Sequence, residues 1–157
     1  MGMLIVDNQF IHMALALINQ SVKAVYISTF KIERNQKPKG RLIEQLFQAL
    51  LEKRKAGVSI KLLFNWHDDK KSIARTNQYA GNFLKPHGIE VRHLKNNRCC
   101  HAKVMIADND KAIIGSHNLS CRSLSANFEV SYLLTDPSDV SQLKSVFQHS
   151  WQDAQNF

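Results

Sequence analysis

The residue types best suited to chemistry are concentrated between positions 101 and 129. In chain order they are His101, Lys103, Asp108, Gly115, Ser116, Asn118 and Glu129, in the pattern H-x-K-x4-D-x6-G-S-x-N with the glutamate after it. On a strand, residues two apart project from the same face, so the imidazole of His101 and the ammonium of Lys103 can converge on one phosphate. A neutral imidazole is a competent nucleophile, and a lysine can neutralise the non-bridging oxygens of a phosphodiester. The pattern therefore favours phosphodiester chemistry.

The other members of the pattern have supporting roles around the same anion. Gly115 allows close approach of the backbone, and Ser116 and Asn118 can add uncharged donors, which together with Lys103 make the expected substrate-binding set. Asp108 lies five residues beyond Lys103, on the other face of the strand or past its end. We keep Asp108 in the predicted catalytic set, with the expectation that it holds the turn and the architecture around the site rather than reacting.

With these residues in this order, the sequence resembles the phospholipase D superfamily, whose signature is this pattern, and in particular its small, dimeric, bacterial Nuc-like endonucleases. The resemblance extends over nearly the whole chain. It implies catalytic roles for His101, Lys103, Asp108, Asn118 and Glu129, the glutamate being the carboxylate that fixes the tautomer of the histidine. It also implies a phosphodiesterase that needs neither metal nor cofactor and works through a phosphohistidine intermediate.

The number of motif copies predicts the assembly. Larger members of the superfamily carry two copies in one chain and small members dimerise, whereas this sequence has one copy. The resemblance therefore implies a homodimer whose active site lies across the twofold axis. One His101 would attack phosphorus, and the other would act as general acid and then as general base.

The charge balance points to a polyanionic partner. Lys and Arg number 21 against 13 Asp and Glu, a net charge of +8, and binding to a phosphate backbone depends on such charge. Basic residues cluster in four places, at 31–41, 53–55, 70–75 and 92–98. Phe30, Trp66 and His67 follow predicted strands beside these charges, where aromatic rings could stack on unpaired bases; Phe30 and Trp66 are equally compatible with a place in the core.

We therefore predict a sequence-nonspecific endonuclease that cleaves DNA, or RNA, with single strands favoured. Two other functions stay open. One is a lipid phosphodiesterase of the phospholipase D type. The sequence argues against this function because it contains no amphipathic helix with a strong basic face. The other is a nucleic-acid-binding module without turnover, which would bind DNA and leave it intact.

Two further patterns imitate functional motifs. His93-Leu94-Lys95 repeats H-x-K but has Cys100 where the aspartate would fall, and we interpret it as an exposed basic strand end. Cys99-Cys100-His101 contains soft metal ligands, but zinc sites usually space paired cysteines by two or more residues, and a zinc ion would block the proposed nucleophile. We predict no metal site.

Hydrophobic periodicity places the motif in an α/β protein. It predicts helices over residues 8–20, 42–57, 72–84 and 136–151, and strands over residues 22–29, 58–64, 89–94, 102–107, 111–115 and 128–135. This order implies a mixed β-sheet sandwiched between helices, in a single domain covering residues 1–157. No run of 18 apolar residues occurs, and the first residues do not have the pattern of a signal peptide. We expect a cytoplasmic protein without stable membrane insertion.

Overall fold

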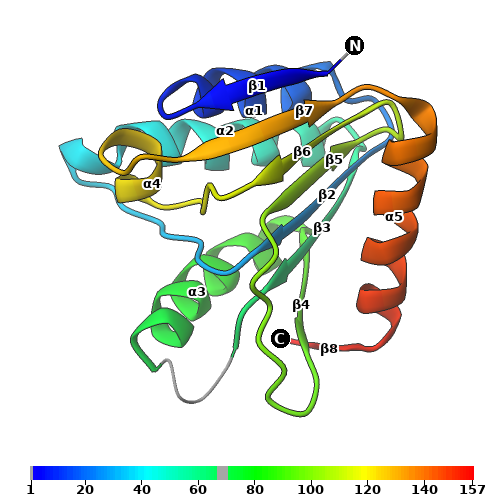
Figure 1. Cartoon of the computed structure of the whole chain (residues 1–157). Coiled ribbons are helices and arrows are strands. Elements are labelled where there is room, and N and C mark those ends of the chain that lie inside the picture. The colour runs from blue at the N-terminus through cyan, green and yellow to red at the C-terminus, as the bar shows by residue number, and fades with distance from the viewer. Residues whose placement is uncertain (1, 67–70) are drawn as a thin grey trace.

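The computed structural model describes residues 2–66 and 71–157, and its centre is one eight-stranded mixed sheet (Figure 1). The strand order is β1-β7-β6-β5-β2-β3-β4-β8. The strands are β1 (Met3–Val6), β2 (Ala24–Thr29), β3 (Ser59–Phe64), β4 (Glu90–Leu94), β5 (Val104–Ala107), β6 (Lys111–Gly115), β7 (Val130–Leu134) and β8 (Ala154–Asn156). The pairs β2–β3 and β3–β4 are parallel, and the other five pairs are antiparallel.

Helices cover both faces of this sheet, as the sequence predicts. They are α1 (Gln9–Gln20), α2 (Arg41–Lys55), α3 (Lys71–Leu84), the short α4 (Cys121–Ser125) and α5 (Pro137–Gln152), with 3₁₀ turns at Pro38–Gly40 and Lys85–His87. The larger buried cluster joins α1, α2 and α3 to one face, and a smaller cluster around Phe147 and Trp151 of α5 covers part of the other. In Figure 1 the long α5 runs on the opposite side of the sheet from α1 and α2.

Local sequence rules explain most of these elements. In α2, apolar residues at helical spacing are buried against the sheet, and Gly57 follows the helix at a φ of +92°, a conformation that glycine adopts without a Cβ clash. The carboxylate of Asp136 accepts hydrogen bonds from the backbone N–H groups of Ser138 and Asp139 and caps α5, with Pro137 at its first position.

Three elements were not predicted. The strands β1 and β8 have four and three residues and lie at the two edges of the sheet, and α4 has five residues. Segments this short carry almost no periodicity, so pairing with distant partners decides them: Met3 pairs with Leu133, and Ala154 with Leu94. The strand predicted over residues 102–107 begins only at Val104, so His101 and Lys103 lie in the extended segment before β5.

The strand directions gather the motif at one end of the sheet. Strand β5 runs antiparallel to β2 and to β6, so Val104 at its start lies opposite Ser28 near the end of β2 and Ile114 near the end of β6. Gly115 at the end of β6 lies in turn opposite Ser131 near the start of β7. The segments that carry the histidine, the Gly-Ser corner and the glutamate therefore meet at the same end of the central strands.

Candidate active site

His101 and Lys103 form the centre of the candidate site. The side-chain nitrogen of Lys103 lies 2.6 Å from the carbonyl oxygen of His101, 3.1 Å from its Nδ1 and 3.3 Å from its Nε2. An ammonium group can only donate, so the carbonyl oxygen is its acceptor here, and this bond holds the Lys103 side chain against the imidazole ring. Burial lowers the pKa of Lys103, while the nearby thiols and Glu129 act in the opposite direction.

Phe30, at the end of β2, packs against both residues. Its ring centroid lies 5.0 Å from that of His101, and the Lys103 ammonium lies 5.5 Å from the Phe30 centroid. The aromatic ring predicted beside the site is therefore in contact with it. The other predicted ring, Trp66, packs instead against Phe64 and Phe157. His67 and Lys70 lie outside the described residues.

The side chain of Ser116 forms a hydrogen bond with Glu129. Its hydroxyl donates to Oε2 of Glu129 and accepts from the N–H of Val130 at 3.0 Å. Gly115 precedes it where a Cβ atom would collide with the Cα and side chain of Ser131, so the corner requires glycine for space. Ser116 is thus a positioning contact for the carboxylate, and because it also lines the groove described below, its substrate-binding role stays a prediction.

Glu129 is held by three side chains and is almost fully buried. Oε1 accepts from Ser123 at 2.7 Å and from Asn127 at 3.1 Å, in addition to the bond from Ser116. Burial alone would raise the pKa of this carboxyl, but these hydrogen bonds outweigh burial and its pKa lies below the ordinary value. The group is therefore an anion with a fixed orientation.

A hydrogen bond to its side-chain oxygen fixes the orientation of Asn118. The Oδ1 atom accepts from the backbone N–H of Lys31 at 3.1 Å, and the backbone N–H of Asn118 donates to Ser123 at 2.9 Å. The amide NH₂ group is therefore the part of this side chain that could donate to a bound anion.

Five of the predicted residues line one open groove. It has a volume of about 660 Å³ and is bordered on its apolar side by Ile114 and Val130; the predicted residues on it are His101, Lys103, Ser116, Asn118 and Glu129. The groove combines a nucleophile, a cation, amide donors and a buried carboxylate, which is the equipment for displacement at a phosphodiester.

Asp108 does not belong to this groove. It lies beyond the other end of β5, and both carboxylate oxygens accept hydrogen bonds from the start of β2: Val22 at 2.6 Å, Lys23 at 2.7 Å and Ala24 at 2.7 Å. At about 3.3 Å per strand residue, this end of β5 is more than about 10 Å from the groove. Burial by itself would raise the pKa of Asp108, but the three backbone donors hold it below its ordinary value. Its contacts are those of an architectural residue.

Replacing Asp108 with alanine is expected to lower the free energy of unfolding by about 3 kcal/mol and to leave the cleavage rate per folded molecule unchanged, because three backbone donors lose a charged acceptor. Urea denaturation and steady-state kinetics measure the two quantities. Asp108→Asn is the matched control: it keeps an oxygen acceptor and tolerates the φ of +54° at this position, so its loss should be smaller. A stable but inactive Asp108→Ala variant would contradict the architectural role.

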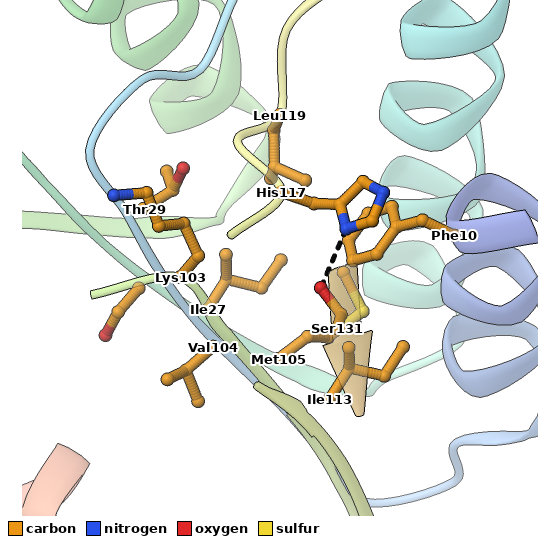
Figure 2. A pocket seen from close by; sticks show the side chains of 11 residues that line it. Phe10, Ile27, Thr29, Lys103, Val104, Met105, Ile113, His117, Leu119 and Ser131 are labelled. Carbon is orange, nitrogen blue, oxygen red and sulfur yellow. Dashed lines mark hydrogen bonds between the residues drawn. The ribbon is translucent and has the colours of Figure 1, made fainter. Parts of the chain in front are cut away.

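His117, for which the sequence suggested no role, is built into the layer beneath the groove. The residue is 2% exposed, and its ring stacks on Phe10 with centroids 4.4 Å apart. Nδ1 lies 2.7 Å from the hydroxyl of Ser131, the contact dashed in Figure 2, and Nε2 lies 3.0 Å from the carbonyl oxygen of Asp7. The Asp7 carboxylate in turn accepts from the N–H of Glu129. His117 therefore ties the turn before α1 to β7, the strand that directly follows the glutamate.

We expect His117 to make the fold less stable in mild acid. Burial holds the pKa of His117 below its ordinary value, against the opposing effects of the Asp7 carbonyl and the Glu129 and Asp7 charges. Below about pH 6.5 the unfolded chain binds a proton that the folded chain does not, so stability falls as pH falls, by up to about 1.4 kcal/mol per pH unit. Urea midpoints between pH 7.5 and 5 should therefore decline less steeply for His117→Gln than for wild type. If the urea midpoints of both proteins decline equally, the acid sensitivity comes from another group. His93 is an example, because burial lowers its pKa as well.

In the two imitating patterns, His93 and Cys100 are buried. His93, expected to be exposed, is 9% exposed and lies in β4, 6.0 Å from the Trp66 ring; β8, which was not predicted, pairs with this strand and covers it. Cys100 is buried, its N–H donates to Asn65 at 3.1 Å, and burial raises the pKa of its thiol to about 11. Within residues 2–66 and 71–157, no cluster of three potential metal ligands occurs.

Comparison with known proteins decides the family. The family model described as a cardiolipin synthase, phospholipase D-like domain matches residues 14–151. The chain belongs to the phospholipase D superfamily. The resemblance inferred from the motif is confirmed at this level, and the fold agrees. The structure of Nuc from Salmonella typhimurium, a phospholipase D family member, superposes with a TM-score of 0.80 at 20% identity, over 100% of this chain and 99% of that one.

Two further matches differ in how much of their own length this chain covers. NucT from Helicobacter pylori superposes with a TM-score of 0.79 at 16% identity, over 100% of this chain and 99% of its own. Cardiolipin synthase 2 of Bacillus anthracis is 26% identical over 143 residues, which are 91% of this chain and 26% of that protein. The chain thus spans about a quarter of the length of the curated relatives it matches. None of the helices in the described ranges has the length and hydropathy of a bilayer-spanning segment.

Proposed function

We propose that this phospholipase D-like chain is a metal-independent nuclease that cleaves phosphodiester bonds in a site shared by two copies of the chain. The observation that carries the proposal is the groove in which His101, Lys103, Asn118 and Glu129 face one space. One such set supplies a nucleophile but only one histidine. Cleavage also needs a group that protonates the leaving oxygen, a contribution of roughly 10²–10⁴ in rate.

An uncovered apolar strip beside the groove supports the second copy. On the face that carries α5, Leu4 pairs with Tyr132 and Tyr132 with Ile114, and Val6 pairs with Val130. These five residues, here called the apolar strip, are each 37–63% exposed. Directly paired residues project from the same face, so the strip is continuous across β1, β7 and β6. Ile114 and Val130 also line the groove, so a second copy seated here would bring its own groove residues close.

In the proposed reaction, a ring nitrogen of one His101 attacks phosphorus and forms an N–P bond while the P–O bond to the leaving group breaks. The protonated His101 of the partner subunit gives its proton to the leaving oxygen. That same imidazole then takes a proton from water, whose oxygen attacks phosphorus and breaks the N–P bond. This step regenerates the free imidazole of the nucleophilic His101 and leaves the phosphate on the product. The two Lys103 ammonium groups and the Asn118 amides neutralise and bind the non-bridging oxygens.

Glu129 has a specific place in this arrangement. Within its own protomer the three bonds to its carboxylate come from Ser116, Ser123 and Asn127, and not from His101. A buried anion at the edge of the groove could fix the tautomer of His101 of the partner subunit and stabilise its protonated form. The dimer would therefore complete each histidine with a carboxylate.

The charge of the chain favours a nucleic acid over a lipid. The chain carries a net charge of +8, and the exposed Lys95 and Arg98 lie in the segment that leads to His101. Part of the predicted basic surface is used internally, since Lys31 pairs with Glu33 at 3.5 Å and Arg34 with Glu44 at 3.7 Å.

The lipid function is the second candidate, because cardiolipin synthases are among the curated relatives that the sequence matches. The test is to incubate purified protein in EDTA with labelled single-stranded DNA, with RNA and with vesicles of anionic phospholipid. We expect DNA to be cut at many positions and the lipids to stay intact. Headgroup release without DNA cleavage would favour the lipid candidate, and tight DNA binding without any product would identify a silent binding module.

A further inference from the structure

A second cavity lies directly beside His101, on the α5 face of the sheet. Its volume is about 250 Å³. The floor is formed by Leu63 and Val104, one wall by Val146 and Phe147 of α5, and the other wall by the segment that contains Arg98 and His101. The Phe147 ring is fixed by stacking on Tyr26 and Trp151, with centroids 5.2 and 5.8 Å away. The cavity, here called the α5 pocket, is therefore a preformed apolar slot with a rigid aromatic wall.

The α5 pocket and the groove share the segment around the proposed nucleophile. His101, Ala102 and Val104 line both spaces. A phosphodiester bound at His101 therefore has the entrance of the α5 pocket next to it, and a group attached to that phosphate can enter without releasing the phosphate. The proposed reaction uses residues of the groove and does not require the α5 pocket.

We propose that the α5 pocket receives one unpaired nucleobase next to the phosphodiester that is cut; this inference rests on the proposed nuclease function. A base is a flat, largely apolar group with hydrogen-bonding edges. The pocket matches it with apolar walls, the hydroxyls of Ser28 and Ser150, and the exposed guanidinium of Arg98. An acyl chain would leave these polar groups without a partner. The positive charge of Arg98 also suits a substrate with further phosphates beside the base.

Occupation of the α5 pocket implies a preference for single strands. In a duplex each base is stacked and paired, and turning it into a pocket costs a few kcal/mol. A single strand avoids most of that cost. The pocket sets no demand for a particular base, because its walls are mainly apolar and all four bases can make apolar contacts with them. We therefore expect cleavage of single strands at least about tenfold faster than cleavage of the matching duplex.

The test uses single-stranded DNA in which one nucleotide lacks its base, compared linkage by linkage with the intact strand on a sequencing gel. Wild type should cut one of the two linkages beside the abasic position about tenfold more slowly than the same linkage in the intact strand. Val146→Trp should fill the pocket at little cost in stability, because Val146 is 63% exposed. This variant should cut both strands at the slow rate. Gln148→Trp, at an exposed position of α5 that does not line the pocket, is the matched control and should behave as wild type.

The outcomes separate this inference from the proposed function. If wild type cuts the linkages beside the abasic position as fast as the intact ones, the base pocket is wrong and the nuclease function stands. If wild type leaves all DNA uncut but hydrolyses phospholipid, and Val146→Trp slows that reaction, the proposed function fails and the pocket holds an acyl chain instead of a base.

Discussion

Replacing His101 with alanine should lower the rate of DNA cleavage by at least about 10⁴-fold, because in the shared site both the nucleophile and the acid are lost. The side chain is exposed at the edge of the groove and makes no contact that the core depends on, so the fold and the assembly should persist. Cleavage is measured on labelled single-stranded DNA in EDTA, and the assembly by light scattering on a sizing column.

A matched histidine variant makes this result specific. His12 is exposed on α1 and does not line the groove, so His12→Ala should cut DNA at the wild-type rate. An active His101→Ala protein that retains wild-type assembly would exclude the phosphohistidine mechanism. Activity from a contaminating metal-dependent nuclease is recognised because it needs divalent metal and is therefore lost in EDTA.

Replacing Tyr132 with glutamate should separate the dimer and lower the cleavage rate by about 100-fold or more. Tyr132 lies at the centre of the apolar strip, paired with Leu4 on one side and Ile114 on the other. At a twofold interface one substitution places two carboxylates in the apolar contact, which is costly because neither has a partner charge. Each separated protomer would keep its own groove but lose the second histidine, so binding of DNA should weaken less than turnover.

The control for the interface variant is Tyr79→Glu. Tyr79 is an exposed aromatic residue on α3, away from the apolar strip, and has an exposed fraction of 56%. It should stay dimeric and active. A monomeric Tyr132→Glu protein that cuts DNA at the wild-type rate would show that one groove suffices, and it would overturn the shared site while leaving His101 as the nucleophile.

Most of the fold follows from local sequence, and the exceptions have a common cause. Helices such as α2 and buried strands such as β3 have enough residues for hydrophobic periodicity to identify them. The edge strands β1 and β8 do not, and they are decided by hydrogen bonds to β7 and β4. The start of β5 is another such case, because it depends on pairing with β2 and β6: the carbonyl of Lys103 accepts from the N–H of Gly115, and the regular register begins at Val104.

The candidate site shows the same division at the level of single residues. The motif predicted which side chains would meet, and the structure brings five of them to one groove. The motif could not predict that Ser116 bonds to Glu129, because that contact depends on how the Gly115 corner meets β7. The role of His117 was also hidden, since its partners Phe10 and Asp7 are more than a hundred positions away in the chain.

By itself, the sequence determined the superfamily and the α/β architecture, and it predicted which residues attack and bind a phosphodiester. These properties depend on residue type and on short spacings, which the order of the chain states directly. Only the tertiary structure decided which backbone groups Asp108 binds, that an apolar strip lies open beside the groove, and that the α5 pocket adjoins His101. Each of these depends on contacts between segments far apart in the sequence, and such contacts are set by the packing of the whole sheet and its helices.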